Sequence, residues 1–439
     1  MNRESLCADD RMRTVCFVAR GDFESSPGGD TVQWRMYERV VREAGFRAIT
    51  WFDDSSIPFA DVYHAFNVDR PLELYPKLAE IKRRGRPFIL STIHHPNEWL
   101  TKYYTSQPSA GALGSLLHRS VLWRSMPSRE TIREIVTVAR DRRIARLLAL
   151  IPSWRQRVRW LLRNADRIML LTSSEATHIR TDFGYEIPPD QRVIVPNWSE
   201  GLGDATAGKP DAFADLPEPP VLVVGRIEPR KASLRISGLA ERARRHVVFV
   251  GLPLHGDGAY ARAFQAAVQR SQYSKWVAGV PRSMLAAFYR HSSFLLNASF
   301  FEASPLVDVE AFALGCPVST TIYAMHHQIL PPDTPLCDPY DDRSILDRLK
   351  WRPSRLPPTQ LVDREMCAPP GGDVPRAREC IARLWRSISR RFSRRASRRE
   401  HLPILKSAVG RCAFGLGASG RSGLAPIIPK APLADSRGD

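Results

Sequence analysis

The sequence alternates short apolar segments with amphipathic helical segments, and this order constrains the fold more than any other feature. The apolar segments are rich in valine, isoleucine and leucine, as strands of a buried sheet are. Strands that are separated by helices pair in parallel, because a parallel pair needs a long crossover connection. The order of segments therefore predicts an α/β protein built on parallel sheets.

A first series of strands is expected in the first 198 residues. Its members are 14–19, 46–52, 61–66, 87–93, 167–173 and 192–197. Asp30 is placed to cap a helix after the first strand, and Gly45 is placed to end that helix. A second helix is expected at about 72–84.

The segment at about 99–164 interrupts this series. It has a helical pattern, many arginines and four tryptophans, Trp99, Trp123, Trp154 and Trp160. One interpretation is a solvated helical insertion in the N-terminal domain. The other is a basic, aromatic surface that meets an acceptor or an anionic lipid head group.

A segment rich in Gly, Ala, Asp and Pro, 199–220, is typical of a domain linker. After it the alternation starts again. The expected strands are 221–225, 247–251, 276–280, 294–298 and 317–322, and the expected helices are 233–244, 260–271, 282–291 and 305–314. Two such series predict two Rossmann-like domains, 1–198 and 221–365, that face each other across a cleft and bind ligands at the carboxyl ends of their strands.

The C-terminal region divides into two parts. Ile381, Leu384, Trp385 and Ile388 lie on one helical stripe, so a helix within 366–392 is expected to pack on the body of the protein. The remainder, 393–439, begins with SRRASRRE and continues with many Gly, Ala and Pro residues. This composition predicts a disordered basic tail.

The chain of 439 residues has a formal net charge of +18, and ten arginines against one glutamate lie between 376 and 399. Such a charge favours an anionic partner: nucleic acid, a phosphorylated metabolite or an acidic membrane. The basic insertion and tail are therefore expected to attract an anionic membrane surface.

The seven cysteines are scattered, without a CxxC pair, which argues against a disulfide framework or a zinc site and for a reducing compartment. The N-terminal apolar run is too short for a signal peptide, and no apolar run approaches the roughly 20 residues of a membrane span. We expect a cytoplasmic protein that can attach to the inner face of the plasma membrane.

The stretch VLVVGRIEPRKAS, 221–233, contains the first candidate site. Gly225 permits a tight turn after the strand, and Arg226 and Lys231 lie close to the start of the next helix. Two cations at a helix N-terminus suit a diphosphate. The alternative is an ordinary βα turn with surface cations.

The stretch FFEASPLVDVEAFALGCPVST, 300–320, contains the second. Ser304 is placed to cap a helix that begins at Pro305, which leaves Glu302 at the carboxyl end of a strand and Glu310 within the helix. Glu302 and the amides near Ser304 and Leu306 can bind sugar hydroxyls, and Glu310 can reach a ribose. Alternatively, Glu302 caps a loop and Glu310 faces solvent. A glycosidase also pairs carboxylates, but it needs no diphosphate site.

These two stretches resemble the motifs of the retaining GT-B glycosyltransferases of family 4, also called glycosyl transferases group 1. E-ASPLVDV-EA followed by GCPV is similar to the paired-glutamate motif of that family, and GRIEPRK is similar to its Gly-Arg…Lys motif. The resemblance covers about 13–330 and is most specific over 221–318. The chain departs from the family at Trp198, at Ser304-Pro305 and at TIYAMHHQ, where the family has Gly, Phe-Gly and a Gly-Gly turn.

The resemblance implies a UDP- or GDP-sugar donor bound by the C-terminal domain. It assigns the donor phosphates to Arg226 and Lys231, the sugar hydroxyls to Glu302 and the ribose to Glu310. The N-terminal domain would hold the acceptor.

The resemblance also implies roles for residues of the N-terminal domain. The glycine-rich loop with Gly28 and Gly29 would approach the diphosphate. His94, in LSTIHHPNE, would lie beside the donor sugar and take part in catalysis. Asn197 stands where the family has Asn-Gly.

The implied reaction moves a sugar to a glycan or lipid-linked acceptor with retention of configuration, without a metal or another cofactor, in cell-surface polysaccharide or glycoconjugate synthesis. A nucleotide-sugar epimerase of the same fold is one alternative. A basic nucleic-acid-binding protein is another, but the chain contains no recognisable nucleic-acid module, so no specific nucleic-acid partner is expected.

Overall fold

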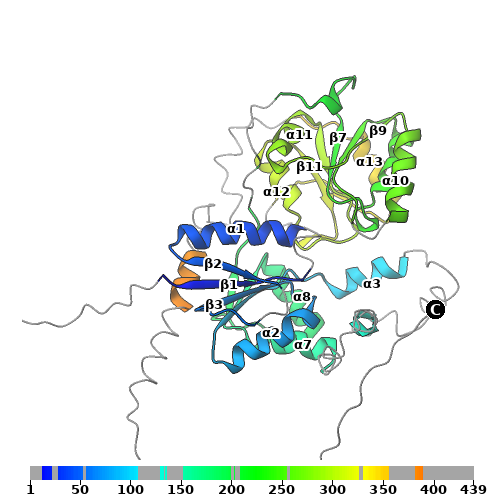
Figure 1. The fold of residues 1–439 in the computed structure, drawn as a ribbon. Helices are drawn as coiled ribbons and strands as arrows, with labels where there is room; N and C mark the ends of the chain where they lie inside the picture. Colours follow the sequence, from blue (N-terminus) through cyan, green and yellow to red (C-terminus); the bar gives the residue numbers. More distant parts are fainter. Residues whose placement is uncertain are drawn as a thin grey trace, which may run out of the picture. The chain divides into compact units, whose positions relative to one another are not determined.

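The computed structural model describes residues 12–21, 28–52, 56–106, 129–132, 134–135, 152–198, 202, 208–254, 258–325, 330–354 and 381–388. These residues form two six-stranded parallel sheets with helices packed against them (Figure 1). The predicted α/β class with two Rossmann-like units is confirmed.

The first sheet has the strand order β2-β1-β3-β4-β5-β6. Its strands are β1 (Thr14–Val18), β2 (Arg47–Trp51), β3 (Val62–Phe66), β4 (Phe88–Ser91), β5 (Arg167–Leu170) and β6 (Arg192–Ile194). β1 lies inside the sheet, and its Val15 pairs with Ala48 on one side and Val62 on the other. β1, β3 and β4 are apolar for most of their length, because helices cover both faces of the sheet.

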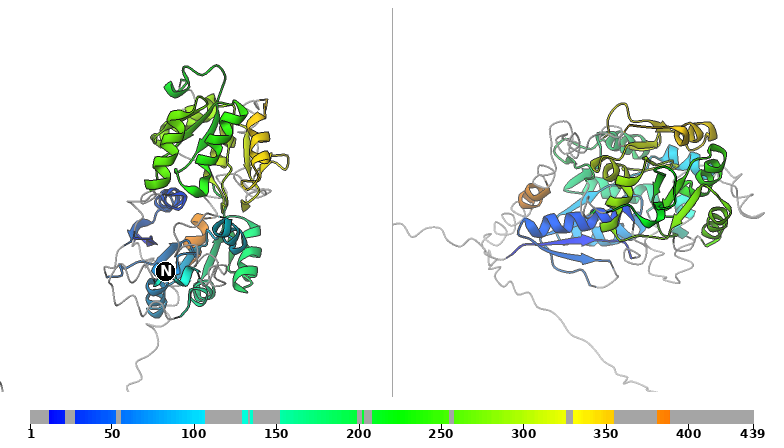
Figure 2. Two further views of the ribbon diagram at one scale, coloured as in Figure 1. Left: turned by 90° about the vertical axis from the view of Figure 1, so that its right-hand side faces the viewer. Right: turned by 90° about the horizontal axis from the view of Figure 1, so that it is seen from above.

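One face of the first sheet is covered by α1 (Gly29–Glu43) and by a helix of residues 381–388, drawn in orange in Figures 1 and 2. Trp385 of this helix packs edge-on against Phe17 and Tyr37, with ring centroids 6.3 Å apart in both pairs. The opposite face packs against α2 (Pro71–Arg83), α7 (Trp154–Asn164) and α8 (Ser173–Phe183).

The second sheet has the order β12-β11-β10-β7-β8-β9. Its strands are β7 (Val221–Val224), β8 (Val247–Val250), β9 (Ser274–Val277), β10 (Phe294–Leu296), β11 (Val318–Thr321) and β12 (Leu336–Cys337). One face packs against α9 (Ser233–Ala243), α10 (Gly258–Arg270) and α13 (Asp342–Lys350). The other packs against α11 (Leu285–His291) and α12 (Leu306–Ala313).

Three local expectations are corrected by the structure. The strand expected at 276–280 is β9, which ends at Val277, because Gly279 turns the chain with a positive φ of 85°. Helix α1 begins one residue before Asp30, with Gly28 at its N-cap. Pro305, not Ser304, occupies the N-cap of α12.

The two ends of the segment at about 99–164 contribute to the hydrophobic cores. α3 (Asn97–Ser106) follows a strand of the first sheet, but its Leu100 and Tyr103 belong to the core of the second. Trp154 of α7 is fully buried in the core of the first. Trp123 and the tail 393–439 lie outside the described residues. None of the described helices is long and apolar enough to cross a bilayer.

Candidate active site

The turn after β7 depends on two glycines. Gly225 has a φ of +148°, and a Cβ on Gly251, the residue after β8, would lie 1.9 Å from the carbonyl oxygen of Gly225. A side chain at position 251 is therefore excluded. Lys231 ends a short 3₁₀ helix, Pro229–Lys231, and its Cε would be 3.2 Å from a Cβ on Gly225. The lysine side chain thus lies over the turn.

Glu302 is the carboxylate that this lysine contacts. Its Oε1 accepts a hydrogen bond from the ammonium of Lys231 and lies 2.9 Å from Nη1 of Arg230. The Glu302 backbone N–H donates to the carbonyl of Tyr323 over 2.8 Å, which fixes the loop after β10. Burial would raise the pKa of Glu302, but Arg230 and Lys231 outweigh burial and hold that pKa well below its usual range.

A second carboxylate completes the group. Oε1 of Glu228 accepts from Arg230 over 2.8 Å and from Arg226 over 3.5 Å. Burial would raise the pKa of Glu228, but the neighbouring cations lower it. We call Arg226, Glu228, Arg230, Lys231 and Glu302 the charged cluster. With three cations and two ionised carboxylates, it has one positive charge in excess, which favours an anionic ligand.

Gly28 and Gly29, at the start of α1, lie next to this cluster. A Cβ on Gly28 would lie 3.7 Å from Nη1 of Arg226, and a Cβ on Gly29 would lie 4.0 Å from Cδ1 of Leu306. The structure therefore brings Gly28 to Arg226 and Gly29 to the first residue of α12. The sequence motifs at positions 28–29 and 225–231, far apart in the chain, meet here.

Asn197 connects the end of the first sheet to the loop before α12. Its Nδ2 donates to the carbonyl of Ser304 over 2.8 Å. Asn197 Oδ1 and Ser304 Oγ are buried, and neither has a hydrogen-bond partner within the described part of the chain. Buried polar atoms in this state are typical of places where a ligand or water completes the hydrogen bonds. Trp198, which stands where the resemblance expects a glycine, is buried and stacks on Tyr37.

Glu310 has different neighbours from Glu302. It accepts a hydrogen bond from the Tyr289 hydroxyl over 2.9 Å and forms an ion pair with Arg282. Its side chain is buried, and burial raises its pKa. Among the residues that the structure describes, no hydrogen bond or ion pair joins Glu310 to the charged cluster.

His94 is engaged on both sides of its ring. Nδ1 lies 2.6 Å from Oδ1 of Asp69, and Nε2 lies 2.8 Å from Oδ2 of Asp182. Burial would lower the pKa of His94, but the two carboxylates outweigh burial and raise it to about 10. The side chain is fully buried, so this geometry argues against contact between the His94 ring and a donor sugar.

His95 is the histidine that lies next to the charged cluster. Its backbone N–H donates to Asp69 over 2.9 Å, and its ring packs edge-on against Phe301 at 5.3 Å. His95 is also among the groups that lower the pKa of Glu302, after Arg230 and Lys231. The sequence reasoning missed His95, Arg230 and Glu228. The available signal was their position: His95 and Arg230 directly neighbour His94 and Lys231, and Glu228 lies two residues after Arg226.

The comparisons with known proteins agree with this architecture. No family model matches the chain. A D-inositol 3-phosphate glycosyltransferase of Segniliparus rotundus is 29% identical over 170 residues, which are 36% of this chain and 37% of that protein. The match thus spans little more than a third of the length of this curated relative.

Solved structures match over most of their length. A sucrose-phosphate synthase from Thermosynechococcus elongatus has a TM-score of 0.55 at 15% identity, covering 88% of this chain and 99% of that one. A trehalose 6-phosphate synthase from Burkholderia multivorans has a TM-score of 0.52 at 13% identity, with coverages of 92% and 100%. Anabaena HepE, solved with UDP and glucose, has a TM-score of 0.51 at 12% identity, with coverages of 88% and 100%.

Two parallel six-stranded sheets, each flanked by helices, together with these likenesses define the fold. The chain has the GT-B fold of glycosyltransferases.

Proposed function

We propose that this protein is a glycosyltransferase that takes a sugar from a UDP- or GDP-sugar donor, retains the anomeric configuration and belongs to the family 4 group. The observation that carries the proposal is the charged cluster at the carboxyl ends of β7 and β10. There Glu302 is held between Arg230 and Lys231, and Arg226 of the same cluster lies next to Gly28. Parallel α/β sheets bind ligands at this end.

In the proposed reaction, negative charge grows on the leaving diphosphate as its bond to the sugar breaks. Arg226 and Lys231 stabilise that charge where it develops, and each such contact is worth about 3 kcal/mol of activation free energy. In this proposal no metal ion is needed to stabilise the charge of the diphosphate. The diphosphate itself takes the proton of the attacking acceptor hydroxyl on the same face of the sugar, which gives retention.

In this proposal the sugar of the donor is bound by Glu302, Ser304 and Asn197. Glu302 accepts from sugar hydroxyls while Arg230 keeps it ionised. Ser304 Oγ and Asn197 Oδ1 are buried without partners in the described part of the chain, and donor hydroxyls would complete their hydrogen bonds. His95, not His94, is the histidine that we place beside the donor sugar, because its ring packs on Phe301, the residue before Glu302.

The same proposal gives the acceptor as a glycan or a lipid-linked glycan of the cell surface, used at the cytoplasmic face of the membrane. α7 supports a membrane location, because Arg155, Arg159 and Arg163 follow one another at helical spacing and none of the three is buried. Reversal of these three charges should reduce co-sedimentation with anionic vesicles severalfold. The control is reversal of three arginines on the exposed side of α1: Arg35, Arg39 and Arg42. Equal sedimentation of both variants would contradict the membrane proposal.

The function is tested by screening UDP-, GDP- and ADP-sugars for thermal stabilisation of the full chain and then measuring release of the nucleoside diphosphate from the best donor. Lys231→Met should abolish most release without unfolding the protein. An epimerase would convert the donor sugar into its epimer without acceptor, so product analysis separates the two activities. If no nucleotide-sugar stabilises the protein or is turned over, the proposed function fails.

A further inference from the structure

Helix α3 belongs to the first sheet by its place in the chain and to the second by its packing. It follows the loop after β4, but its Leu100 and Tyr103 are buried in the hydrophobic core of the second sheet. Trp99 contacts both domains. Its ring packs edge-on against His178 of α8 at 5.4 Å and against Tyr323, after β11, at 5.9 Å. Moving the two sheets apart at α3 would therefore expose apolar surface to water, which is unfavourable.

The start of α3 is bound to the domain of the first sheet by two aspartates. Oδ2 of Asp182, in α8, accepts from the backbone N–H of Asn97 over 2.8 Å. Oδ2 of Asp69 accepts from the backbone N–H of His95, two residues before α3, over 2.9 Å. Both carboxylates also flank the ring of His94. Hydrogen bonds to ionised acceptors are stronger than those between neutral groups, so this end of α3 is held firmly.

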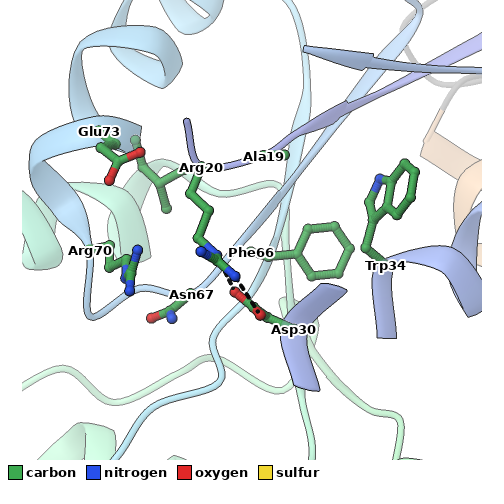
Figure 3. Close-up of a pocket in the computed structure, with 9 residues that line it drawn as sticks. Ala19, Arg20, Asp30, Trp34, Phe66, Asn67, Arg70 and Glu73 are labelled. Carbon is green, nitrogen blue, oxygen red and sulfur yellow. Dashed lines mark hydrogen bonds and ion pairs between the residues drawn. The ribbon is translucent and has the colours of Figure 1, made fainter. Parts of the chain in front are cut away.

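The loop that carries Asp69 is itself fixed. Asn67, the residue after β3, has a φ of +71°, and its Oδ1 accepts from the backbone N–H of Asp69 over 3.1 Å. The backbone N–H of Asn67 donates to the carbonyl of Ser91 in β4 over 2.9 Å. Figure 3 shows Asn67 and Arg70, which lie on either side of Asp69 in this loop. The aspartate that binds the start of α3 thus has a defined position on the first sheet.

The second half of α3 is bound to the domain of the second sheet by Lys102. Its Nζ lies 4.4 Å from the ring centroid of Tyr340 and 4.8 Å from that of Tyr323, and it donates a hydrogen bond to the Tyr323 hydroxyl. The two tyrosine rings meet edge-on at 5.4 Å. An ammonium over the face of an aromatic ring is attracted by the negative charge of that face. Lys102 therefore connects α3 to the segments after β11 and β12 at once.

Tyr103 reaches the backbone that carries Glu302. Its ring lies 5.3 Å from the ring of Phe300 and 5.3 Å from the ring of Phe301. Phe301 directly precedes Glu302, and its carbonyl accepts from Nη1 of Arg230 over 3.0 Å. A helix that follows a strand of the first sheet thus packs against the residue next to the carboxylate of the charged cluster.

Lys102 reaches the same backbone from another direction. The carbonyl of Tyr323 accepts from the backbone N–H of Glu302 over 2.8 Å, and Tyr323 is the residue to which Lys102 donates. Tyr103 and Lys102 therefore contact two residues, Phe301 and Tyr323, that adjoin Glu302 by a peptide bond and by a hydrogen bond. Displacement of α3 would release both.

We propose that α3 is a strap that holds the two domains in one arrangement before any nucleotide binds, and that Tyr103 and Lys102 are positioning residues for Glu302. The strap is fixed at its start to the domain of the first sheet and at Lys102 and Tyr103 to the domain of the second. The strap does not depend on the proposed function, whereas the role of Tyr103 and Lys102 in transfer rests on it.

Pulsed electron spin resonance on the full chain without nucleotide tests the strap. Spin labels are attached at Arg83→Cys in α2 and Gln265→Cys in α10, both exposed positions. The cysteines other than the buried Cys16, Cys316 and Cys337 are first replaced by serine. The distance distribution should be narrow in this protein. The double substitution Lys102→Ala and Tyr103→Ala should broaden it by more than about 2 Å, the size of a domain rearrangement.

Thr105→Ala is the matched control. Thr105 is exposed on the same helix, and its hydroxyl donates to the Thr101 carbonyl of that helix over 2.8 Å, so the distribution should stay narrow. Lys102→Met, at an exposed position, should also broaden the distribution and serves if the double variant does not fold by circular dichroism. A broad distribution without these substitutions would overturn the strap, and so would an unchanged distribution in the folded variants.

Steady-state kinetics with the best donor test the positioning of Glu302. Tyr103→Ala should lower kcat about 100-fold, the effect of a displacement of about 1 Å at a reacting group. The KM for the donor should stay within about threefold, because Arg226 and Lys231 still bind the diphosphate. Tyr103→Phe keeps the ring and should restore kcat. Equal losses in both variants, or a raised KM with an unchanged kcat, would overturn the positioning role.

The two proposals fail separately. If the spin labels report the strap but no nucleotide-sugar is turned over, the transferase proposal fails alone. If a donor is turned over and the α3 variants change neither the distance distribution nor kcat, the strap proposal fails alone.

Discussion

Replacing Glu302 by glutamine should separate the binding of the leaving diphosphate from the transfer of the sugar. The charged cluster has three cations and two carboxylates, so Glu302→Gln raises its net charge from +1 to +2. A free nucleoside diphosphate should then bind at least about fivefold more tightly, because removing one negative charge a few ångströms away is worth about 1 kcal/mol even at the dielectric of water. Transfer should fall about 100- to 1,000-fold, since the ionised carboxylate that accepts from the hydroxyls of the reacting sugar is gone.

The stability of the fold should fall by a smaller amount. Glu302 is buried against Arg230 and Lys231, so deleting it altogether would leave two cations short of one partner and cost about 3–5 kcal/mol. The glutamine oxygen still accepts from Lys231, which limits the loss to about 1–3 kcal/mol. Calorimetric titration with UDP and GDP, release of diphosphate from the best donor and urea unfolding measure the three quantities.

Glu228→Gln is the matched control. It removes the same charge from the same cluster and from the same Arg230, but among the described residues the Glu228 carboxylate forms ion pairs with Arg226 and Arg230 and none with the Lys231 ammonium. Diphosphate binding should tighten as in Glu302→Gln, while transfer should fall less than about tenfold. Equal losses of transfer in both variants would show that only the charge balance matters. Transfer by Glu302→Gln within tenfold of the unaltered protein would refute the assignment of Glu302.

Three further perturbations test the site and the fold. Gly28→Ala would place a Cβ 2.9 Å from Asp30 Oδ1 and should weaken donor binding about tenfold, whereas Gly29→Ala, with its nearest contact at 4.0 Å, should bind the donor normally in the same titration. His95→Asn should lower transfer about tenfold and leave urea unfolding unchanged. His94→Asn should leave transfer unchanged and destabilise the protein in urea, because the two rings lie in different positions. The unfolding free energy should fall as pH rises between about 6.5 and 10, by up to about 1.4 kcal/mol per pH unit, because His94 holds its proton in the folded state and loses it in the unfolded state. His94→Asn should abolish that slope, and an unchanged alkaline slope in urea titrations would contradict the raised pKa.

Much of the fold follows from short stretches of sequence. Valine-rich segments separated by helices indicated two parallel sheets, because each pair of neighbouring parallel strands needs a crossover connection between them. β12 was not predicted, since two strand residues carry no readable period. The polar α13 was not predicted either. The positions of Gly225 and Glu302 at strand ends were also readable, because they depend on neighbours only a few residues away.

The partners of the site residues were not readable in this way. Lys231 and Glu302 are 71 positions apart in the chain, and His94 meets Asp182 across 88 positions. Nothing local indicates that Glu310 pairs with Arg282, or that α3 leaves the first sheet to join the core of the second. Such pairings depend on how the helices and loops pack against the sheets, which brings residues distant in the chain into contact.

The sequence by itself determined the two sheets, the glycine turn and the presence of cations and carboxylates at strand ends, because these features follow from backbone geometry within a few residues. Only the tertiary structure decided that Arg230 shares Glu302 with Lys231 and that His95 lies at the cluster while His94 is enclosed by two aspartates. The physical reason is that adjacent side chains such as these two histidines have the same composition and local preference. Their different roles arise from which distant groups surround each one.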